Sequence, residues 1–179
     1  GAGERLAGVI VETEAYVGPE DLASHAAGGR RTARVASMWK APGTVYVYFT
    51  YGMHYCMNIS CEREGHSASV LLRALMPTEG IETMRRLRAG TRPRKKPLSD
   101  RDLASGPGKL CQALAVDRSL DGVDILNSPH LALLDRPEGQ PEPPILATPR
   151  VGLGSEEVLG PWKHKELRFV WADHPCLSR

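Results

Sequence analysis

Residues 44–60 constrain the fold of this chain more than any other segment. Valine and phenylalanine alternate with tyrosine over residues 45–49, and a second strand-forming run follows over residues 53–60. Alternate residues of an extended chain point to opposite faces, so both runs predict β-strands. The Tyr51-Gly52 pair lies between them and predicts a turn. The segment is therefore expected to form a β-hairpin with an aromatic tip.

A strand is also predicted near the start of the chain, where the apolar residues 9–11 run into an acidic stretch. On an extended chain Glu12, Glu14 and Tyr16 share one face. One of the carboxylates could activate a water molecule beside a stacking ring. The alternative is a half-buried strand with a solvated acidic face, and this segment alone favours that alternative.

The remaining pattern mixes strands and helices. Strands are expected at residues 69–75 and 167–171, and a helix is expected from Thr78 until Gly90 ends it. The other expected segments are a long ordered loop at 17–44, a proline-rich basic surface loop at 91–99, a helical turn at 100–104, a helix at 110–116 and an irregular stretch at 127–149.

Composition indicates one soluble domain. The chain has 179 residues, of which 41% are hydrophobic and 25% charged, and no change in composition along it suggests a second domain. No apolar run is long enough to span a membrane, and no signal peptide opens the sequence. The four cysteines lack zinc-binding spacing, so we expect reduced thiols that lie mostly in the core.

Basic residues are clustered although the net charge is only +2. Such clusters are usually solvated surface, but their repetition makes nucleic acid a serious candidate partner. Lys109 follows a Gly-Pro-Gly sequence before a predicted helix and could hold a phosphate, although Leu103 and Leu110 exclude a Walker loop. The clusters comprise Arg30, Arg31 and Arg34, then Arg85, Arg86 and Arg88, and finally Arg92, Arg94, Lys95 and Lys96.

A series of ordered motifs extends this interpretation. They are VETEAY (11–16), ASH (23–25), GTVYVY (43–48), YGM (51–53), MNIS (57–60), LLRAL (71–75), SGP (105–107), KL (109–110) and RVG (150–152). Together they resemble the alkyladenine (3-methyladenine) DNA glycosylase family, and the match runs from about residue 9 to residue 170. The chain departs from the family pattern at residues 31–35 and 39–41.

The resemblance implies an α+β fold, in one compact domain with a curved, largely antiparallel sheet, a few flanking helices and long loops. Residues 1–179 would form the catalytic domain, without the helix and strand that the family has upstream of Glu4. It also implies a monofunctional base-excision enzyme. Such an enzyme flips a damaged purine out of duplex DNA and hydrolyses the N-glycosidic bond, leaving an abasic site.

By this resemblance, Tyr16, His25 and Tyr48 form the pocket that sandwiches the flipped base. Asn58 would crowd the 2-amino group of guanine, although an Asn in a strand is more often a local hydrogen-bond partner. Tyr51 at the hairpin tip would fill the gap in the DNA. Without the resemblance, a partly exposed packing residue would be the better interpretation of Tyr51.

Glu14 is the expected general base, which would activate water for attack at the sugar C1′. Arg73 would position this water, unless it forms only a strand-end ion pair, and the backbone carbonyl of Val151 would complete the cradle. Glu12 lies on the same predicted face, so the residue pattern alone does not separate the two carboxylates. The mechanism requires no metal and no cofactor.

The expected partner is double-stranded DNA that contains 3-methyladenine, 7-methylguanine, hypoxanthine or ethenoadenine. Arg30, Arg31 and Lys109 are the candidate phosphate contacts. We expect a monomer without membrane association, located in the nucleus because its substrate is there. Two alternatives remain open, namely a module that binds distorted nucleic acid without cutting it and a small-nucleotide hydrolase using Glu14 and His25.

Overall fold

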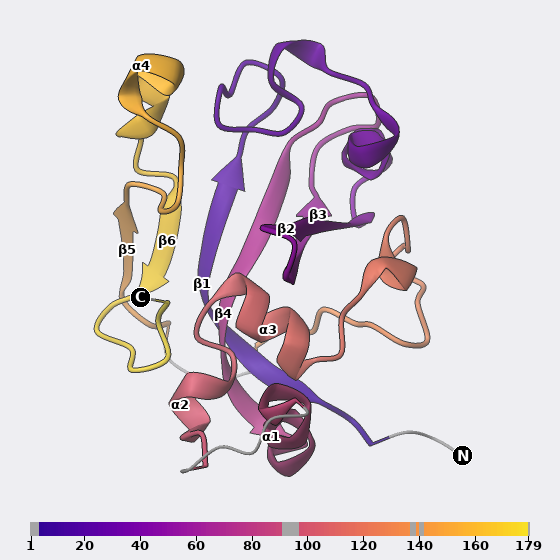
Figure 1. Ribbon diagram of the computed structural model, residues 1–179, viewed down its shortest axis with the longest axis vertical. Coiled ribbons are helices and arrows are strands. Elements are labelled where there is room, and N and C mark those ends of the chain that lie inside the picture. Colours follow the sequence, from indigo (N-terminus) through magenta and orange to yellow (C-terminus); the bar gives the residue numbers. More distant parts are fainter. Residues whose placement is uncertain (1–3, 91–96, 137–138, 140–141, 179) are drawn as a thin grey trace.

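A computed structural model describes residues 4–90, 97–136, 139 and 142–178. Its centre is an antiparallel sheet in the order β2-β3-β4-β1-β6-β5, so the first strand lies in the middle of the sheet (Figure 1). The predicted α+β class and the single compact domain are confirmed. The strands are β1 (Ala7–Tyr16), β2 (Val45–Thr50), β3 (His54–Ser60), β4 (Ser69–Glu79), β5 (Ile145–Thr148) and β6 (Arg168–Trp171).

Short helices cover one face of the sheet. In Figure 1, α3 lies in front of β4, α1 lies at the lower end of β4, and α4 sits apart above β5 and β6. Pro107 at the start of α3 suits a first helical turn, where its missing N–H leaves no bond unmade. The α-helices are α1 (Ile81–Ala89), α2 (Asp100–Leu103), α3 (Pro107–Ala113) and α4 (Glu156–Leu159), and the 3-10 helices are η1 (Ala27–Gly29), η2 (Ala33–Trp39), η3 (Arg118–Leu120) and η4 (Gly160–Lys163).

The predicted hairpin is present. β2 and β3 pair antiparallel from Val45 opposite Ile59 to the last pair before the turn. Tyr51 and Gly52 both have left-handed backbone conformations, with φ of 51° and 65°, and the Met53 N–H donates to the Thr50 carbonyl. Two consecutive residues in the left-handed conformation match the right-handed twist of the flanking strands, so the chain reverses in a tight turn at the tip of the hairpin.

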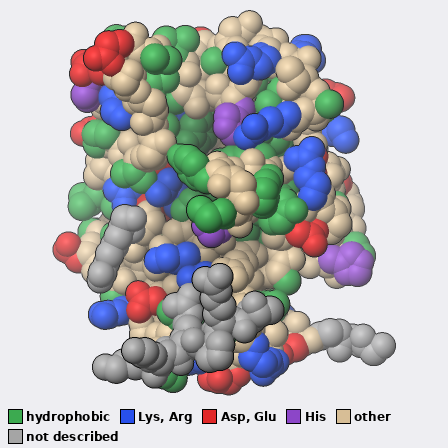
Figure 2. Space-filling view, in the orientation of Figure 1, with side chains coloured by type: hydrophobic (Ala, Val, Ile, Leu, Met, Phe, Trp, Pro, Cys, Tyr) green, Lys and Arg blue, Asp and Glu red, His purple; other side chains and the backbone are tan. Residues whose placement is uncertain are grey.

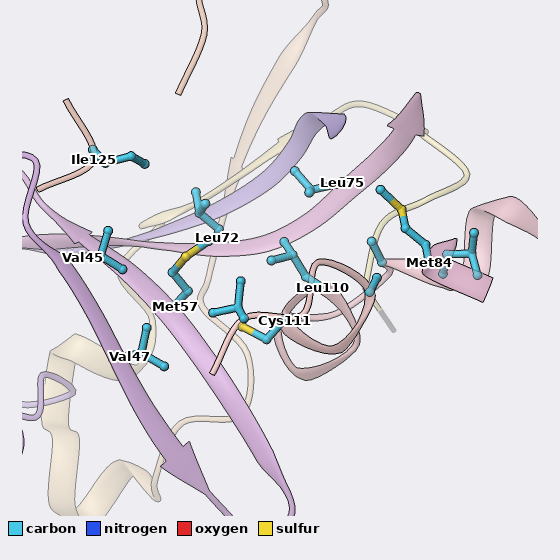
Figure 3. Close-up of a cluster of buried hydrophobic side chains, with 13 residues drawn as sticks. Val45, Val47, Met57, Leu72, Leu75, Met84, Leu110, Cys111 and Ile125 are labelled. Atoms are coloured by element: carbon cyan, nitrogen blue, oxygen red, sulfur yellow. The ribbon is translucent and has the colours of Figure 1, made fainter. Parts of the chain in front are cut away.

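The main hydrophobic core lies between the sheet and its helices (Figure 3). Val45 and Val47 from β2 and Met57 from β3 meet Leu72 of β4 and Leu110 of α3. A second cluster joins η2 to Tyr46, and a third joins Val11 to the C-terminal segment. The acidic strand β1 is therefore covered by chain segments far from it in the sequence.

This covering corrects one expectation about β1. Glu12 and Glu14 are fully buried, so the solvated acidic face is wrong. The pairing of β1 with β4 shifts register around Glu12, which breaks the simple alternation and lets Val11 and Glu12 both be buried.

Several element boundaries also differ from the sequence pattern. β4 continues to Glu79, so the following helix begins at Ile81 rather than Thr78. β5 lies within the stretch 127–149 that was expected to be irregular, because an exposed four-residue edge strand carries little sequence signal. The long loop at 17–44 is ordered but contains η1 and η2. Residues 91–96 of the predicted basic loop lie outside the described residues.

The cysteines fit the expectation of reduced, mostly buried thiols. Cys56, Cys111 and Cys176 are buried and Cys61 is exposed, and all four are free. Within the described ranges, no helix is long and apolar enough to cross a membrane. Among the same residues, no group of three or more His, Cys, Asp or Glu side chains could hold a metal ion.

Candidate active site

A pocket of about 480 Å³ opens beside the hairpin tip. Its walls come from the end of β1, the loop after it, the hairpin, β4 and the segment 151–154. On the face shown in Figure 2, apolar side chains line a hollow and Lys and Arg side chains lie near it. Eight predicted site residues line this pocket, namely Tyr16, His25, Arg30, Tyr48, Tyr51, Asn58, Arg73 and Val151.

The aromatic part of the pocket is a packed cluster. His25 meets Tyr48 edge-on with ring centroids 4.6 Å apart, and Tyr48 stacks on Tyr46 at 5.1 Å. His25 Nδ1 lies 3.0 Å from the Tyr46 hydroxyl. Burial lowers the pKa of His25, and the positive charges of Arg34 and Arg30 lower it further. The imidazole is therefore neutral at neutral pH and has one N–H to donate.

Glu14 lies immediately behind the pocket wall. Its Oε1 accepts the Val151 N–H at 2.8 Å and lies 3.2 Å from Arg73 Nη1. Its Oε2 accepts the Tyr16 hydroxyl at 2.9 Å. Burial raises the pKa of Tyr16, and the neighbouring Glu14 charge raises it further, so the phenol keeps its proton and donates. All three partners line the pocket, although Glu14 itself has no exposed surface.

Glu12 has a different environment, which separates the two carboxylates. Its Oε1 accepts from Arg73 Nε at 2.8 Å and from Arg168 Nε at 2.7 Å. The backbone N–H of Ser178 donates to Glu12 Oε2 at 2.6 Å, and the Ser178 hydroxyl donates to Oε1 at 2.7 Å. Glu12 does not line the pocket. It is the centre of a buried network that holds Arg73 in place beneath Glu14.

Replacing Glu12 with Gln is expected to destabilise the fold by about 3–5 kcal/mol at pH 7, because Arg168 loses its buried counter-charge and Arg73 keeps only Glu14. Burial raises the pKa of Glu12, but the hydrogen bonds from Arg168, Ser178 and Arg73 outweigh it and the pKa is lowered. A lowered pKa stabilises the fold above the unfolded-state value of about 4.3, and this contribution disappears as pH falls through the folded-state pKa. Urea unfolding at pH 7 and pH 3 measures both effects.

The matched control is Glu79→Gln, since Glu79 is half-exposed and pairs with exposed Arg5. It is expected to change the free energy of unfolding by less than about 1 kcal/mol at either pH. A gap between wild type and Glu12→Gln that is as large at pH 3 as at pH 7 would contradict the assigned charge network.

Tyr51 and Asn58 lie at different depths of the pocket. Tyr51 is 80% exposed at the hairpin tip, far more than a packing residue would be. Asn58 is buried and its Nδ2 donates to Ser69 Oγ at 3.1 Å. Among the described atoms its Oδ1 has no hydrogen-bond partner. Asn58 therefore bonds to a side chain of the neighbouring strand β4, not to the local backbone as an Asn in a strand more often does, and its Oδ1 remains an acceptor without a partner among the described atoms.

The predicted phosphate contacts are all exposed. Arg30 lines the pocket, and Arg31 stacks on the Trp39 ring at 3.9 Å. Lys109 Nζ donates to Ser105 Oγ at 3.2 Å near the start of α3. Their exposure leaves them able to reach a polyanion beside the pocket.

The second basic cluster does not add to this surface. Arg85 pairs with Glu82 and Asp100, Arg86 pairs with Glu4, and Arg88 is buried. All four residues of the third cluster lie within 91–96, outside the described residues. Charge repetition along the chain is therefore a weaker indicator of a nucleic-acid surface than the first cluster alone.

Sequence reasoning missed two buried charges near the pocket. Arg150 and Asp21 form a two-pronged ion pair, and neither side chain has exposed surface. Arg150 lies in the RVG motif beside Val151, which was the only signal available from sequence. Tyr46 was also left without a role, although the alternation over 45–49 places it on the same face as Tyr48.

Fold and site together define a protein with an aromatic-walled pocket that is backed by a buried carboxylate. The sequence matches the family model described as Methylpurine-DNA glycosylase over residues 1–175. The chain belongs to this family, which confirms the resemblance drawn from its motifs.

Similar proteins carry related names. The chain is 49% identical to the DNA-3-methyladenine glycosylase of Homo sapiens and 48% identical to that of Mus musculus, over 98% of its length in both cases. These matches cover 58% and 52% of the two relatives, so the chain spans little more than half of their length. It is also 42% identical to a putative 3-methyladenine DNA glycosylase of Methanocella arvoryzae, with 98% of the chain and 81% of the relative covered.

Proposed function

We propose that this protein is a DNA glycosylase that releases alkylated or deaminated purines from duplex DNA and leaves an abasic site. The observation that carries the proposal is the position of Glu14, held by Tyr16, Arg73 and Val151 directly behind a pocket of aromatic rings. Family membership and the names of the relatives agree with this chemistry.

The pocket suits one flipped purine. Stacking on an aromatic side chain contributes roughly 1–3 kcal/mol per base, and positively charged alkylpurines gain further cation–π attraction. A hydrogen-bond donor from the segment around the neutral His25 would meet the 6-position of the base. Hypoxanthine accepts a hydrogen bond there, whereas the amino group of adenine donates, so the pocket favours hypoxanthine over adenine. Asn58 lies in the wall, where it would crowd the 2-amino group of guanine.

Glu14 activates the attacking water in this proposal. Its Oε1 has two donors and its Oε2 has one, among the contacts of the described residues, so Oε2 retains an acceptor site. A water bound there could donate to the carboxylate while it attacks C1′, where positive charge develops. Arg73 Nη1 and the Val151 carbonyl would orient this water. Because a damaged base is a good leaving group, one carboxylate suffices without a metal or cofactor.

The DNA-binding part of the proposal uses exposed residues around the pocket. Tyr51 enters the duplex and occupies the space of the flipped nucleotide, which offsets the cost of unstacking. Arg30, Arg31 and Lys109 contact phosphates and position the duplex without reading its sequence. The protein acts as a monomer on double-stranded DNA, and its substrate places it in the nucleus.

The test is an abasic-site assay on oligonucleotide duplexes, each with one lesion, compared with undamaged duplex and with free nucleosides. We expect release of hypoxanthine, 7-methylguanine, 3-methyladenine and ethenoadenine from duplexes, and no hydrolysis of nucleosides. Binding to all lesions without any abasic site would instead establish a recognition module. Hydrolysis of free nucleosides at rates equal to those of duplexes would establish a small-nucleotide hydrolase.

A further inference from the structure

Asp21 and Arg150 bury a charge pair behind the pocket. Arg150 Nη1 donates to Asp21 Oδ2 at 2.5 Å, and Nη2 donates to Oδ1 at 2.9 Å. Asp21 also accepts the N–H groups of Ala23 and Val17. A neutral side chain such as Asn could also accept these N–H groups, and burying two charges costs desolvation free energy, so hydrogen bonds to the loop do not by themselves account for the charges. The charges themselves therefore require an explanation.

Arg150 acts on the ring of Tyr16. Its Cζ lies 4.7 Å from the ring centroid, and its Nη1 also donates to the Ala15 carbonyl at 2.9 Å. Tyr16 lines the pocket and Arg150 does not, so the guanidinium contacts the ring without itself lining the pocket. A base stacked on the pocket side would share this ring with a buried cation.

The charge of the base then matters. Methylation of a purine nucleotide at a ring nitrogen, as in 7-methylguanine, gives a cation, whereas hypoxanthine and ethenoadenine are neutral. An unbalanced guanidinium behind Tyr16 would repel a cationic base and compete for the negative face of the ring. The Asp21 carboxylate balances this charge at hydrogen-bond distance.

We propose that Asp21 is a specificity-determining positioning residue, which neutralises Arg150 so that Tyr16 accepts cationic alkylpurines as well as neutral lesions. This inference rests on the proposed glycosylase function. It predicts that the two classes of lesion respond differently to the charge of the buried pair.

The decisive variant is Asp21→Asn, which keeps the size and an acceptor oxygen but leaves Arg150 unbalanced. We expect the ratio of kcat/KM for 7-methylguanine to that for hypoxanthine to fall about tenfold, as a unit charge about 10 Å away implies at an effective dielectric constant near 20. If the substitution loosens the loops that carry Asp21 and Arg150, it should slow the release of both bases by the same factor. This factor cancels in the ratio of the two kcat/KM values. A ratio within twofold of wild type would overturn the inference.

Two further variants keep the test decisive if Asp21→Asn fails to fold. Arg150→Gln leaves the negative charge unbalanced and should raise the same ratio, and the double variant Asp21→Asn/Arg150→Gln should restore it. A ratio that falls in Arg150→Gln would contradict the charge argument. If wild type releases both bases and no variant moves the ratio, only this inference fails, whereas release of neither base by wild type would reject the proposed function as well.

Discussion

Replacing Glu14 with Gln is expected to lower the rate of base release by about 10²–10⁴-fold while the protein still binds lesion-containing duplex. The amide has nearly the same shape: its oxygen can still accept from the Val151 N–H, and its NH2 group can donate to the Tyr16 hydroxyl oxygen. It cannot take a proton from water or balance positive charge at C1′. Single-turnover abasic-site formation measures the rate, and fluorescence anisotropy with a labelled duplex measures binding.

A matched control for this variant is Glu62→Gln, because Glu62 is exposed and does not line the pocket. It should leave the rate and the affinity unchanged. Undiminished base release by Glu14→Gln would reject Glu14 as the general base and would turn attention to another group near the pocket. Loss of binding together with activity would indicate that Glu14 holds the pocket together rather than activating water.

The second large effect is expected at the hairpin tip. Tyr51→Ser should reduce excision from duplex DNA by about 10–100-fold, which corresponds to losing a stacking interaction of roughly 1–3 kcal/mol in the flipped state. Residue Tyr51 is 80% exposed and lies in the turn between β2 and β3, outside the hydrophobic core. Its replacement is therefore expected to leave the core intact. A fluorescent base analogue next to the lesion reports flipping directly.

Tyr51→Phe separates the ring from the hydroxyl, because it retains the aromatic plug and should keep most of the duplex activity. Release from single-stranded oligonucleotides should change little in Tyr51→Ser, since an unstacked base leaves no gap to fill. Equal loss on single strands and duplexes would mean that Tyr51 supports the pocket rather than the DNA stack. Normal duplex activity of Tyr51→Ser would refute the wedge.

Local sequence signals were sufficient for the hairpin and for β1 and β6, and the family resemblance supplied the α+β class. Strict alternation over residues 45–49 is a backbone property of strands, so it needs no tertiary information. The Tyr51-Gly52 pair likewise identifies the turn. Two predictions were wrong, namely the helix start at Thr78 and the irregular structure of the segment that contains β5. Local signals are weak in both places, and pairing within the sheet decides where these strands lie.

The chain by itself determined which chemical groups were available, namely two carboxylates on one strand and aromatic rings on a hairpin. Only the tertiary structure decided how the two carboxylates differ. Arg73, Val151, Arg168 and Ser178, which donate hydrogen bonds to Glu12 or Glu14, all lie far along the chain from them. Burial of Asp21 with Arg150 was likewise invisible, since the two residues stand 129 positions apart. Pairing of charges across such separations depends on how the loops pack against the sheet, and no local pattern encodes that packing.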